Sequence, residues 1–411
     1  MTDVSAPHRG GAGGARPLAS RLLELIASGQ AVTRTELAKR LGVAPSTISI
    51  TVSQLVERGL VAEQGTRASG GGRPRKVLRL GGADEFAVAA DVGGRHARVG
   101  VVQPGGGLTD VSTVPFAIAD GPEVALSRLA DTLEALAERH GRGRLRGVGL
   151  SLPGPVDASS GVVTLPSRMP GWNKFPVGPW LTERFGVPAA VDNDANCMAV
   201  GEYATHPDRH RQTIMVKIGS AIGAGIIVDG RLHRGATGAA GDITHVRIDA
   251  AGDIPCSCGN SGCLETVASG AALVRIVRER GVDIGSIEDV VRLASDADPT
   301  ATSAVRRAGR YLGQVLAANV NFFNPDAVYL GGILSTLEPL VAAVRSQLYE
   351  ACHPLVTEHL TIERASLGVD AGLFGAGQFA LQRAVRLAFG SAAEGAPRTG
   401  LPHQSEATTE V

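Results

Sequence analysis

One arrangement occurs twice in this chain and constrains its fold more than any other feature. At 86–102 an apolar strand, a turn with Asp91, Gly93 and Gly94, and a second apolar strand follow one another. The same order of strand, glycine turn and strand recurs at 214–228. The repetition predicts two related α/β halves, in each of which backbone N–H groups of the turn can approach a phosphate. An ordinary β-hairpin is the alternative, because many hairpins contain Gly-Gly.

Polar residues follow another predicted strand, in the stretch "PAAVDNDAN". Asp192, Asn193 and Asp194 stand between the apolar strand and a predicted helix. Open α/β sheets bind ligands at the carboxyl ends of their strands, and a carboxylate there could act as a general base on a hydroxyl. Capping of the following helix is an equally good interpretation of these residues alone.

Three of the five cysteines in the chain lie in the stretch "CSCGNSGCLET". Cys256, Cys258 and Cys263 follow His245 in the pattern H-x10-C-x-C-x4-C. One imidazole and three thiolates are typical ligands of a four-coordinate structural Zn²⁺. The alternatives are chance clustering of reduced cysteines and a redox pair, and the absence of C-x-x-C argues against the second. The pattern therefore predicts a zinc site.

The first 80 residues have the pattern of a helix-turn-helix. Thr33 and Glu36 form a capping box, Gly42 supplies a turn, and Pro45 begins the next helix. The second helix of such a motif enters the major groove of DNA. Its outer face carries hydroxyl groups that can meet phosphates and base edges, on Ser46, Thr47, Ser49 and Thr51. An ordinary three-helix packing unit is the alternative.

A basic, glycine-rich segment follows the predicted recognition helix. Short strands at 60–62 and 76–80 flank "GTRASGGGRPRK", and arginines on such a wing can enter the minor groove: Arg67, Arg73 and Arg75. Residues 16–80 hold 11 Lys/Arg and 4 Asp/Glu, a net +7, whereas the whole chain is formally neutral, which leaves −7 elsewhere. The asymmetry predicts that this segment meets a polyanion, with a solvated basic linker as the alternative.

Composition also predicts the domain organisation and the location of the protein. No apolar run approaches the roughly 20 residues of a membrane span. The N-terminal residues lack the apolar core of a signal peptide, so we expect a cytoplasmic protein without a membrane partner. We expect a disordered lead at 1–15, a winged helix-turn-helix domain at 16–82, an α/β body at 83–389 and a disordered tail at 390–411.

The body resembles the ROK family of repressors, open-reading-frame products and sugar kinases. The motifs that carry the resemblance lie between residues 91 and 377: "DVGG", "GLSLPGPVD", "VDNDAN", "GSAIGAG", "GAAGDITH", "CSCGNSGCLE", "NPDAVYLGG" and "DAGLFGAG". The resemblance implies an actin/hexokinase-like α/β fold of two lobes around a sugar cleft, with a hinge near 192–200 and a C-terminal helix closing on the first lobe. A winged helix in front of this body is the layout of the family's transcriptional regulators.

Motif matching implies two binding sites. The sugar site would comprise Asn193, Asp194, Asp242, His245 and Glu265. One ring nitrogen of His245 would then face the sugar and the other the zinc, and Asp194 would be the catalytic base if the protein were a kinase. An ATP/Mg²⁺ site, which we expect to be degenerate, would comprise Asp91, Gly93, Gly94, Gly219, Ser220, Gly331 and Gly332. For Glu265 alone, a surface carboxylate at the start of a helix is the alternative.

Both phosphate turns depart from the pattern of the family's kinases, while the sugar motif is largely intact. Arg95 replaces a threonine, and Ala221 replaces a glycine in the second turn. In the sugar motif, Asp242 stands for the usual glutamate and Thr244 for a glycine. Because phosphoryl transfer needs a positioned γ-phosphate and Mg²⁺, these changes favour a sugar sensor.

We therefore expect a sugar-responsive transcriptional regulator, most simply a repressor. It would bind a double-stranded DNA operator as a homodimer or homotetramer, because one short recognition helix reads too few bases. The effector would be a sugar or sugar phosphate, and the zinc would be structural. An ATP-dependent sugar kinase and a constitutive DNA-binding protein with a structural zinc are the alternatives.

Overall fold

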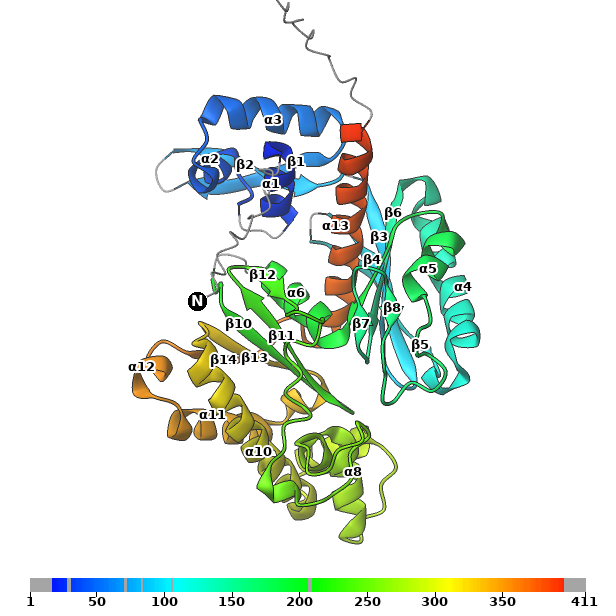
Figure 1. The fold of residues 1–411 in the computed structure, drawn as a ribbon, viewed down its shortest axis with the longest axis vertical. Helices are drawn as coiled ribbons and strands as arrows, with labels where there is room; N and C mark the ends of the chain where they lie inside the picture. Colours follow the sequence, from blue (N-terminus) through cyan, green and yellow to red (C-terminus); the bar gives the residue numbers. More distant parts are fainter. Residues whose placement is uncertain are drawn as a thin grey trace, which may run out of the picture.

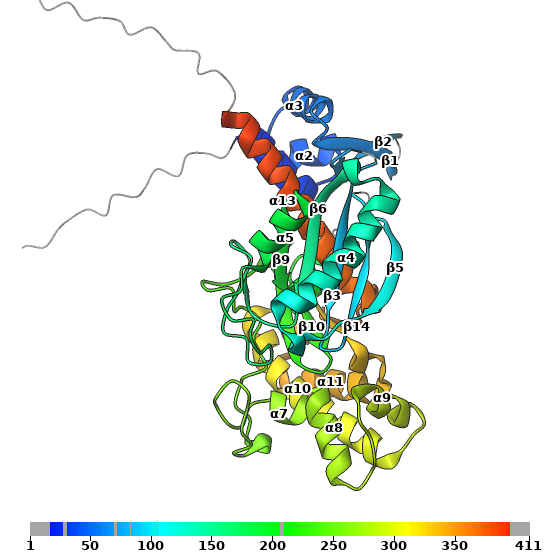
Figure 2. The same cartoon turned by 90° about the vertical axis from the view of Figure 1, so that its right-hand side faces the viewer.

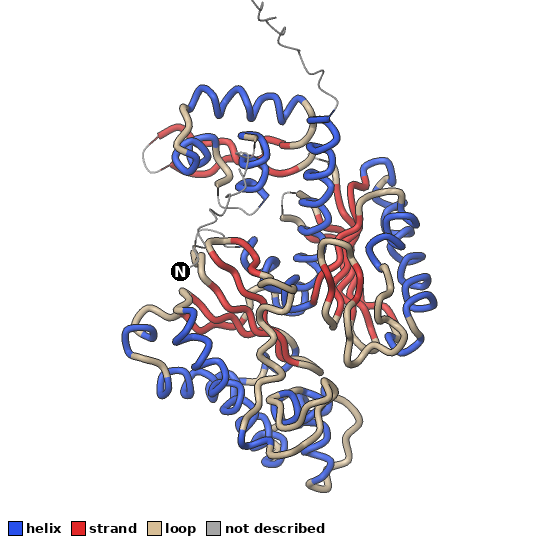
Figure 3. The backbone as a smooth tube through the Cα atoms, viewed as in Figure 1, coloured by secondary structure: helices blue, strands red, loops and turns tan. Residues whose placement is uncertain are grey.

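The computed structural model describes residues 17–27, 31–69, 72–82, 84–104, 106–205 and 209–394. In these residues a small N-terminal unit precedes two larger lobes, each built on a five-stranded sheet (Figures 1 and 3). The predicted fold class, a two-lobed α/β body behind a winged helix, is confirmed. The predicted lead at 1–15 lies outside the described residues. None of the described helices is long and apolar enough to cross a bilayer.

The N-terminal unit is a winged helix-turn-helix. Thr33 and Glu36 form the predicted capping box, and Gly42 ends the second helix with a φ of +64°. Ile48, Val52 and Leu55 of the third helix are buried in its core. Its elements are α1 (Leu18–Ala27), α2 (Arg34–Leu41), α3 (Pro45–Glu57), β1 (Val61–Ser69) and β2 (Gly72–Leu80).

The wing differs from its prediction, because most of the basic segment lies in two paired β-strands rather than in a loop. Strands β1 and β2 are antiparallel far beyond 60–62 and 76–80, and Arg67 lies opposite Arg75 in the ladder. Register shifts between Gln64 and Thr66 and between Arg67 and Ser69 accommodate the pairing. Backbone hydrogen bonding therefore outweighs the flexibility expected from the glycine composition.

The first lobe has the sheet order β5-β4-β3-β6-β9, in which β3 is antiparallel to β4 and parallel to β6. Helices α4 and α5 pack on one face, and α13 packs on the other. The elements are β3 (Phe86–Val92), β4 (His96–Val102), β5 (Leu108–Pro115), α4 (Pro122–His140), β6 (Leu145–Leu152), β7 (Val156–Asp157), β8 (Val162–Val163), α5 (Val177–Phe185) and β9 (Ala189–Asn193).

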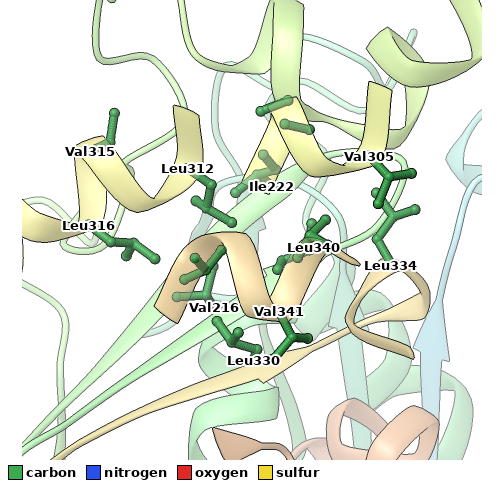
Figure 4. Close-up of a cluster of buried hydrophobic side chains, with 14 of the residues drawn as sticks. Val216, Ile222, Val305, Leu312, Val315, Leu316, Leu330, Leu334, Leu340 and Val341 are labelled. Carbon is green, nitrogen blue, oxygen red and sulfur yellow. The ribbon is translucent and has the colours of Figure 1, made fainter. Parts of the chain in front are cut away.

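The second lobe repeats this order as β12-β11-β10-β13-β14, with the same strand directions. The predicted duplication is thus a duplication of sheet topology. Helices α10 and α11 cover one face with a dense aliphatic core (Figure 4). The elements are β10 (Thr213–Ile218), β11 (Ile222–Val228), β12 (Arg231–His233), α7 (Glu265–Ala268), α8 (Gly270–Glu279), α9 (Ile287–Ser295), α10 (Pro299–Phe323), β13 (Ala327–Gly331), α11 (Glu338–Ala351), α12 (Pro354–Thr357) and β14 (Thr361–Arg364). Short 3-10 helices lie at Ile118–Asp120, Arg142–Arg144, Asp249–Ala251, Ile333–Thr336 and Gly368–Asp370.

Two central helices, α6 (Asp194–Thr205) and α13 (Ala371–Glu394), join these units. They approach so closely that a Cβ on Gly375 would lie 1.8 Å from the carbonyl oxygen of Cys197. A Cβ on Gly149 of β6 would lie 2.1 Å from the oxygen of Ala376. The "DAGLFGAG" motif is therefore a packing motif.

At its other end α13 reaches the winged unit (Figures 1 and 2). Val385 is buried in the core of that unit, and α13 contacts α1. Helix α13 also continues to Glu394, so residues 390–394 are helical where the sequence predicts the start of the tail. Its alanines favour helix, and Gly395 and Pro397 follow only afterwards. Residues 395–411 lie outside the described part of the chain.

Candidate functional site

A cleft of about 590 Å³ lies between the lobes. It is lined by the 153–173 segment of the first lobe, the end of β9, the start of β11 and the loop before α7. Four of the predicted sugar-binding residues line it together: Asn193, Asp242, His245 and Glu265. Asp194 is not among the described residues that line the cleft.

Glu265 is the most deeply buried carboxylate of this cleft, with 3% of its surface exposed. Its Oε2 accepts a hydrogen bond from the backbone N–H of Ile222 at 3.2 Å. Burial is the main reason that the pKa of Glu265 is raised, and the charge of Arg168 opposes this effect. Among the described residues, no donor is aligned in a hydrogen bond with Oε1. That oxygen can therefore accept a hydroxyl.

Arg168 of the first lobe crosses the cleft to this carboxylate. Its Nη2 lies 2.5 Å from Oε1 of Glu265, and its Nη1 donates to the carbonyl oxygen of Ser220 at 3.4 Å. The contact is close in distance but is not aligned as a hydrogen bond, so it acts as an ion pair. Arg168 thus links the two lobes at the place where a ligand hydroxyl would bind.

The predicted metal ligands form one cluster. The ligand atoms of His245, Cys256, Cys258 and Cys263 all lie within 4.8 Å of one another. Nδ1 of His245 is 3.5 Å from Sγ of Cys256, and Sγ of Cys258 is 3.8 Å from Sγ of Cys263. These distances match the roughly 3.5–3.8 Å edges of a tetrahedral site with Zn–S near 2.3 Å. The cluster could hold a metal ion.

This cluster also adjoins the cleft, which His245 and Cys258 both line. Since Nδ1 of His245 faces the sulfurs, its other ring nitrogen points away from them, and the residue lines the cleft. Burial is the main reason that the pKa of the Cys263 thiol is raised to about 12, so ligation requires a cation that displaces its proton. Glu265 begins α7 two residues after Cys263, which ties the sugar acceptor to the metal loop.

A lysine that the sequence analysis did not single out controls the environment of Asp194. Nζ of Lys217, on β10, forms an ion pair with Oδ2 of Asp194, and 22% of its side chain is exposed. Burial disfavours the charged form of Lys217, but the charges of Asp194 and Asp91 outweigh it and raise the pKa of the ammonium. The lysine therefore stays protonated against the carboxylate that would be the base of a kinase.

In the two predicted nucleotide-binding turns, backbone N–H groups are already hydrogen-bonded within the turn. The N–H of Gly93 donates to the oxygen of His96 at 2.9 Å, and that of Gly219 donates to the oxygen of Ala221 at 3.0 Å. Burial is the main reason that the pKa of Asp91 is raised, and Ser151 donates to its carboxylate. Gly94, Ser220, Gly331 and Gly332 lie at the corresponding strand ends. In these turns the amides of Gly93 and Gly219 are therefore not available to a phosphate.

The predicted DNA-binding helix α3 lies at the end of the molecule farthest from the second lobe (Figure 1). Ser46 and Thr47 are exposed, Ser49 and Thr51 are half-buried, and the Thr51 hydroxyl donates to the oxygen of Thr47 at 2.9 Å. Ile50 was not anticipated; it is 62% exposed on the same helix. An exposed apolar side chain there suits a thymine methyl group.

An ion-pair network ties this helix to the wing. Arg34 of α2 donates to the oxygen of Ser49 at 3.2 Å and pairs with Glu63 of β1 at 2.8 Å. Lys76 of β2 pairs with the other oxygen of Glu63 at 2.6 Å. The hydrogen bond from Lys76 is the main reason that the pKa of Glu63 is lowered. The side chains of Arg67, Arg73 and Arg75 lie outside the described residues.

A protein-family model with the description ROK family matches residues 87–383. The chain belongs to the ROK family. A second model, for the MarR family, matches residues 15–73 and covers most of the winged unit. The suspected resemblance is thus confirmed for the body, and a winged domain of MarR type precedes it.

Relatives of two kinds share this ROK body. The chain is 30% identical over 319 residues to a glucokinase of Halalkalibacterium halodurans, which covers 73% of this chain and 96% of the relative. It is 29% identical over 358 residues to a xylose repressor of Bacillus spizizenii, covering 86% and 92%. The repressor alignment thus covers more of this chain than the glucokinase alignment does.

Solved structures similar to this chain also include both a transcriptional regulator and a glucokinase of the ROK family. A ROK family transcriptional regulator, a homolog of the E. coli MLC protein, superposes with a TM-score of 0.73 at 27% identity and covers 92% of this chain and 98% of its own. A ROK glucokinase from Streptomyces griseus in complex with glucose and AMPPNP gives 0.62 at 28% identity, covering 72% and 99%.

Proposed function

We propose that this ROK protein is a sugar-responsive transcriptional repressor. The observation that carries the proposal is the contrast between the residues that line the cleft and the carboxylate that would be the base of a kinase. Asn193, His245 and Glu265 line it as sugar-binding groups, whereas Asp194 is ion-paired with Lys217. The winged unit and the alignment with xylose repressors over 86% of the chain support the DNA-binding half of the proposal.

We also propose that the His/Cys cluster holds a structural Zn²⁺. Three thiolates and one imidazole satisfy a tetrahedral ion and leave no coordination position for a substrate. His245 and the chain from Cys256 to Cys263 would be held by the ion, and Glu265 would be held with them. The role of the metal is then to orient sugar acceptors before the sugar arrives.

The route from sugar to DNA follows from two contacts. A sugar hydroxyl that binds Oε1 of Glu265 competes with Arg168, which joins the lobes. A change in lobe closure would be transmitted through α13, which packs on the first lobe and on α6 and carries Val385 into the winged unit. The coupling free energy of such linkages is typically ~1–3 kcal/mol, or about 5- to 150-fold in DNA affinity. A homodimer on a palindromic operator would present two recognition helices.

Two substitutions should separate sugar binding from DNA binding. We expect Glu265→Gln to bind DNA from beside its own gene as the wild type does, but to lose relief by sugars, because an amide supplies a donor where a charged acceptor is needed. We expect Arg73→Ala to weaken DNA binding by about 1–3 kcal/mol and to leave sugar affinity unchanged. Fluorescence anisotropy at fixed salt, with xylose, glucose, mannose, N-acetylglucosamine and their phosphates, measures both.

Matched controls carry the same chemical change elsewhere. Glu338→Gln changes an exposed side chain on α11 of the same lobe, and Arg128→Ala changes an exposed side chain on α4. Both should behave as the wild type. If no sugar alters DNA binding of the wild type, the protein is a constitutive DNA binder and the sensor proposal fails. If Arg73→Ala binds DNA unchanged, the wing assignment fails.

An ATP-dependent sugar kinase remains the second candidate, because Asp194 is present and the body aligns with glucokinases. The ion pair with Lys217 predicts that the wild type shows no sugar-dependent ATP turnover in a coupled assay. It also predicts that Lys217→Ala binds sugar as the wild type does but gains no more than trace turnover, because the phosphate turns remain internally bonded. Wild-type turnover that Asp194→Asn abolishes would establish the kinase instead.

A further inference from the structure

A second cavity, of about 580 Å³, lies on the other side of the hinge from the sugar cleft. Strand β9 forms one wall, β12 another, and α6 and α13 complete it. Two consecutive residues at the end of β9 border different cavities: Asp192 lines this one, and Asn193 lines the sugar cleft. Neither the sugar site nor the DNA-binding face uses this cavity.

The lining of this cavity is strongly basic. Its described charged residues are Arg231, Arg234, Arg383 and Arg386 against Asp192, which gives a formal net charge of +3 (four arginines minus one aspartate). Arg231 lies on β12 and Arg234 directly follows this strand of the second lobe, whereas Arg383 and Arg386 lie on the C-terminal half of α13. A concave surface with this charge attracts small anions.

One of these guanidinium groups is already oriented. Arg234 pairs with Asp192, which is 3% exposed, and its Nε lies 3.1 Å from Oδ2 of that carboxylate. The guanidinium carbon of Arg234 lies 5.2 Å from the ring centroid of Phe379. Asp192 is held in turn by the amide of Asn196 at 2.9 Å. A guanidinium fixed by a buried carboxylate and an aromatic face loses little entropy when it binds a further anion.

The arginines of α13 face the same space. Arg383 is half-buried, and its Nη1 donates to the oxygen of Ser159 at 3.4 Å, while Arg386 is exposed one turn further along. Arg231 lines this cavity and also a smaller one between the second lobe and the winged unit. A ligand that joined these residues would bridge β12 and α13 directly beneath the DNA-binding unit.

We propose that this cavity binds a phosphate dianion, as inorganic phosphate or as the phosphate group of a sugar ester. Planar guanidinium groups match the tetrahedral oxygens of phosphate by bidentate hydrogen bonds, and Arg234, Arg383 and Arg386 outnumber the one aspartate that lines the cavity. The ligand would hold β12 against α13 and so act on the element that carries the winged unit. The site does not depend on the proposed sugar cleft.

Isothermal titration calorimetry of the full-length protein in phosphate-free buffer tests this inference, with inorganic phosphate, glucose 6-phosphate and glucose as probes. We expect saturable binding of at least one phosphate probe and a loss of at least about tenfold in affinity in Arg383→Gln/Arg386→Gln. The matched double variant Arg128→Gln/Arg139→Gln removes two exposed arginine side chains of α4 and should bind as the wild type does. Thermal unfolding checks that both variants are folded.

The outcomes separate the possible sources of phosphate. Equal affinities for both phosphate probes would identify phosphate itself as the ligand, and tighter binding of the ester would show that the cavity also contacts the sugar. Any glucose binding in the sugar cleft should survive the double substitution, so failure of this inference leaves the proposed function standing. The inference is overturned if neither phosphate probe binds or if binding survives in Arg383→Gln/Arg386→Gln. It is also overturned if that variant loses only DNA affinity, because the arginines would then contact the DNA backbone.

Discussion

Replacing Cys256 with serine is expected to abolish binding of the proposed zinc and, with it, the proposed sugar binding. The loop from His245 to Glu265 has little secondary structure of its own, only one 3-10 turn and the isolated bridges Arg247–Cys263 and Pro255–Ser261. Backbone hydrogen bonds such as Cys256 N–H to Asn260 O at 2.8 Å order part of this loop, and the proposed zinc would fix the rest. Apparent binding energies of structural zinc sites are about 10–16 kcal/mol, and such energy is also folding energy. Metal analysis should fall from about one zinc per chain to near zero, and calorimetry should detect no sugar.

The same substitution should affect DNA binding much less, because the winged unit has a separate core. Cys352→Ser is the matched control: this cysteine is buried between helices, outside the cluster, and should leave the metal content unchanged. A Cys256→Ser protein that bound sugar with wild-type affinity would show that the metal does not position Glu265. Metal-free wild-type protein would contradict the zinc proposal itself.

Replacing Gly375 with alanine is expected to destabilise the protein by at least about 3 kcal/mol. The new Cβ would lie 1.8 Å from the oxygen of Cys197, so α13 must move away from α6. Overpacking typically costs 1–3 kcal/mol, and here the obstacle is backbone rather than a flexible side chain. Because α13 also carries Val385 into the winged core, operator affinity should lose its dependence on sugar.

Urea unfolding measures the loss of stability, and Gly143→Ala provides the control. No described atom lies within 4 Å of a Cβ built on Gly143, so that substitution should change stability by less than about 0.5 kcal/mol. A Gly375→Ala protein of wild-type stability would mean that α6 and α13 can separate freely. In that case α13 could not transmit lobe closure.

Much of the fold was predictable because its signals are local. The capping box at Thr33 and the turn at Gly42 depend on neighbouring residues, and both are present as predicted. The repeated strand and turn units predicted two related halves, and the two sheets share one strand order. The short lengths predicted for the wing strands and the predicted start of the tail at 390 were wrong, since strand pairing continues into the glycine-rich segment and α13 continues to Glu394.

The candidate site likewise has features that the sequence predicted and features that it did not. The spacing of His245 and three cysteines predicted four groups that could hold one ion, because a short loop limits where its residues can go. The partners of the carboxylates could not be read from any spacing: Lys217 meets Asp194, Arg168 meets Glu265, and Arg234 meets Asp192. A signal for Lys217 did exist, namely a lone charge in the apolar strand "TIMVKI".

The sequence by itself thus determined the family, the two-lobed body behind a winged helix, the His/Cys cluster that could hold a metal ion, and four of the residues that line the cleft. These depend on residue type, period and short spacing. Only the tertiary structure decided that an ammonium group pairs with the carboxylate that would be the base of a kinase, that an arginine crosses the cleft to Glu265, and that four arginines line one cavity. Each of these depends on how separate elements pack against one another, because ion pairs form between side chains that folding, rather than sequence separation, brings together.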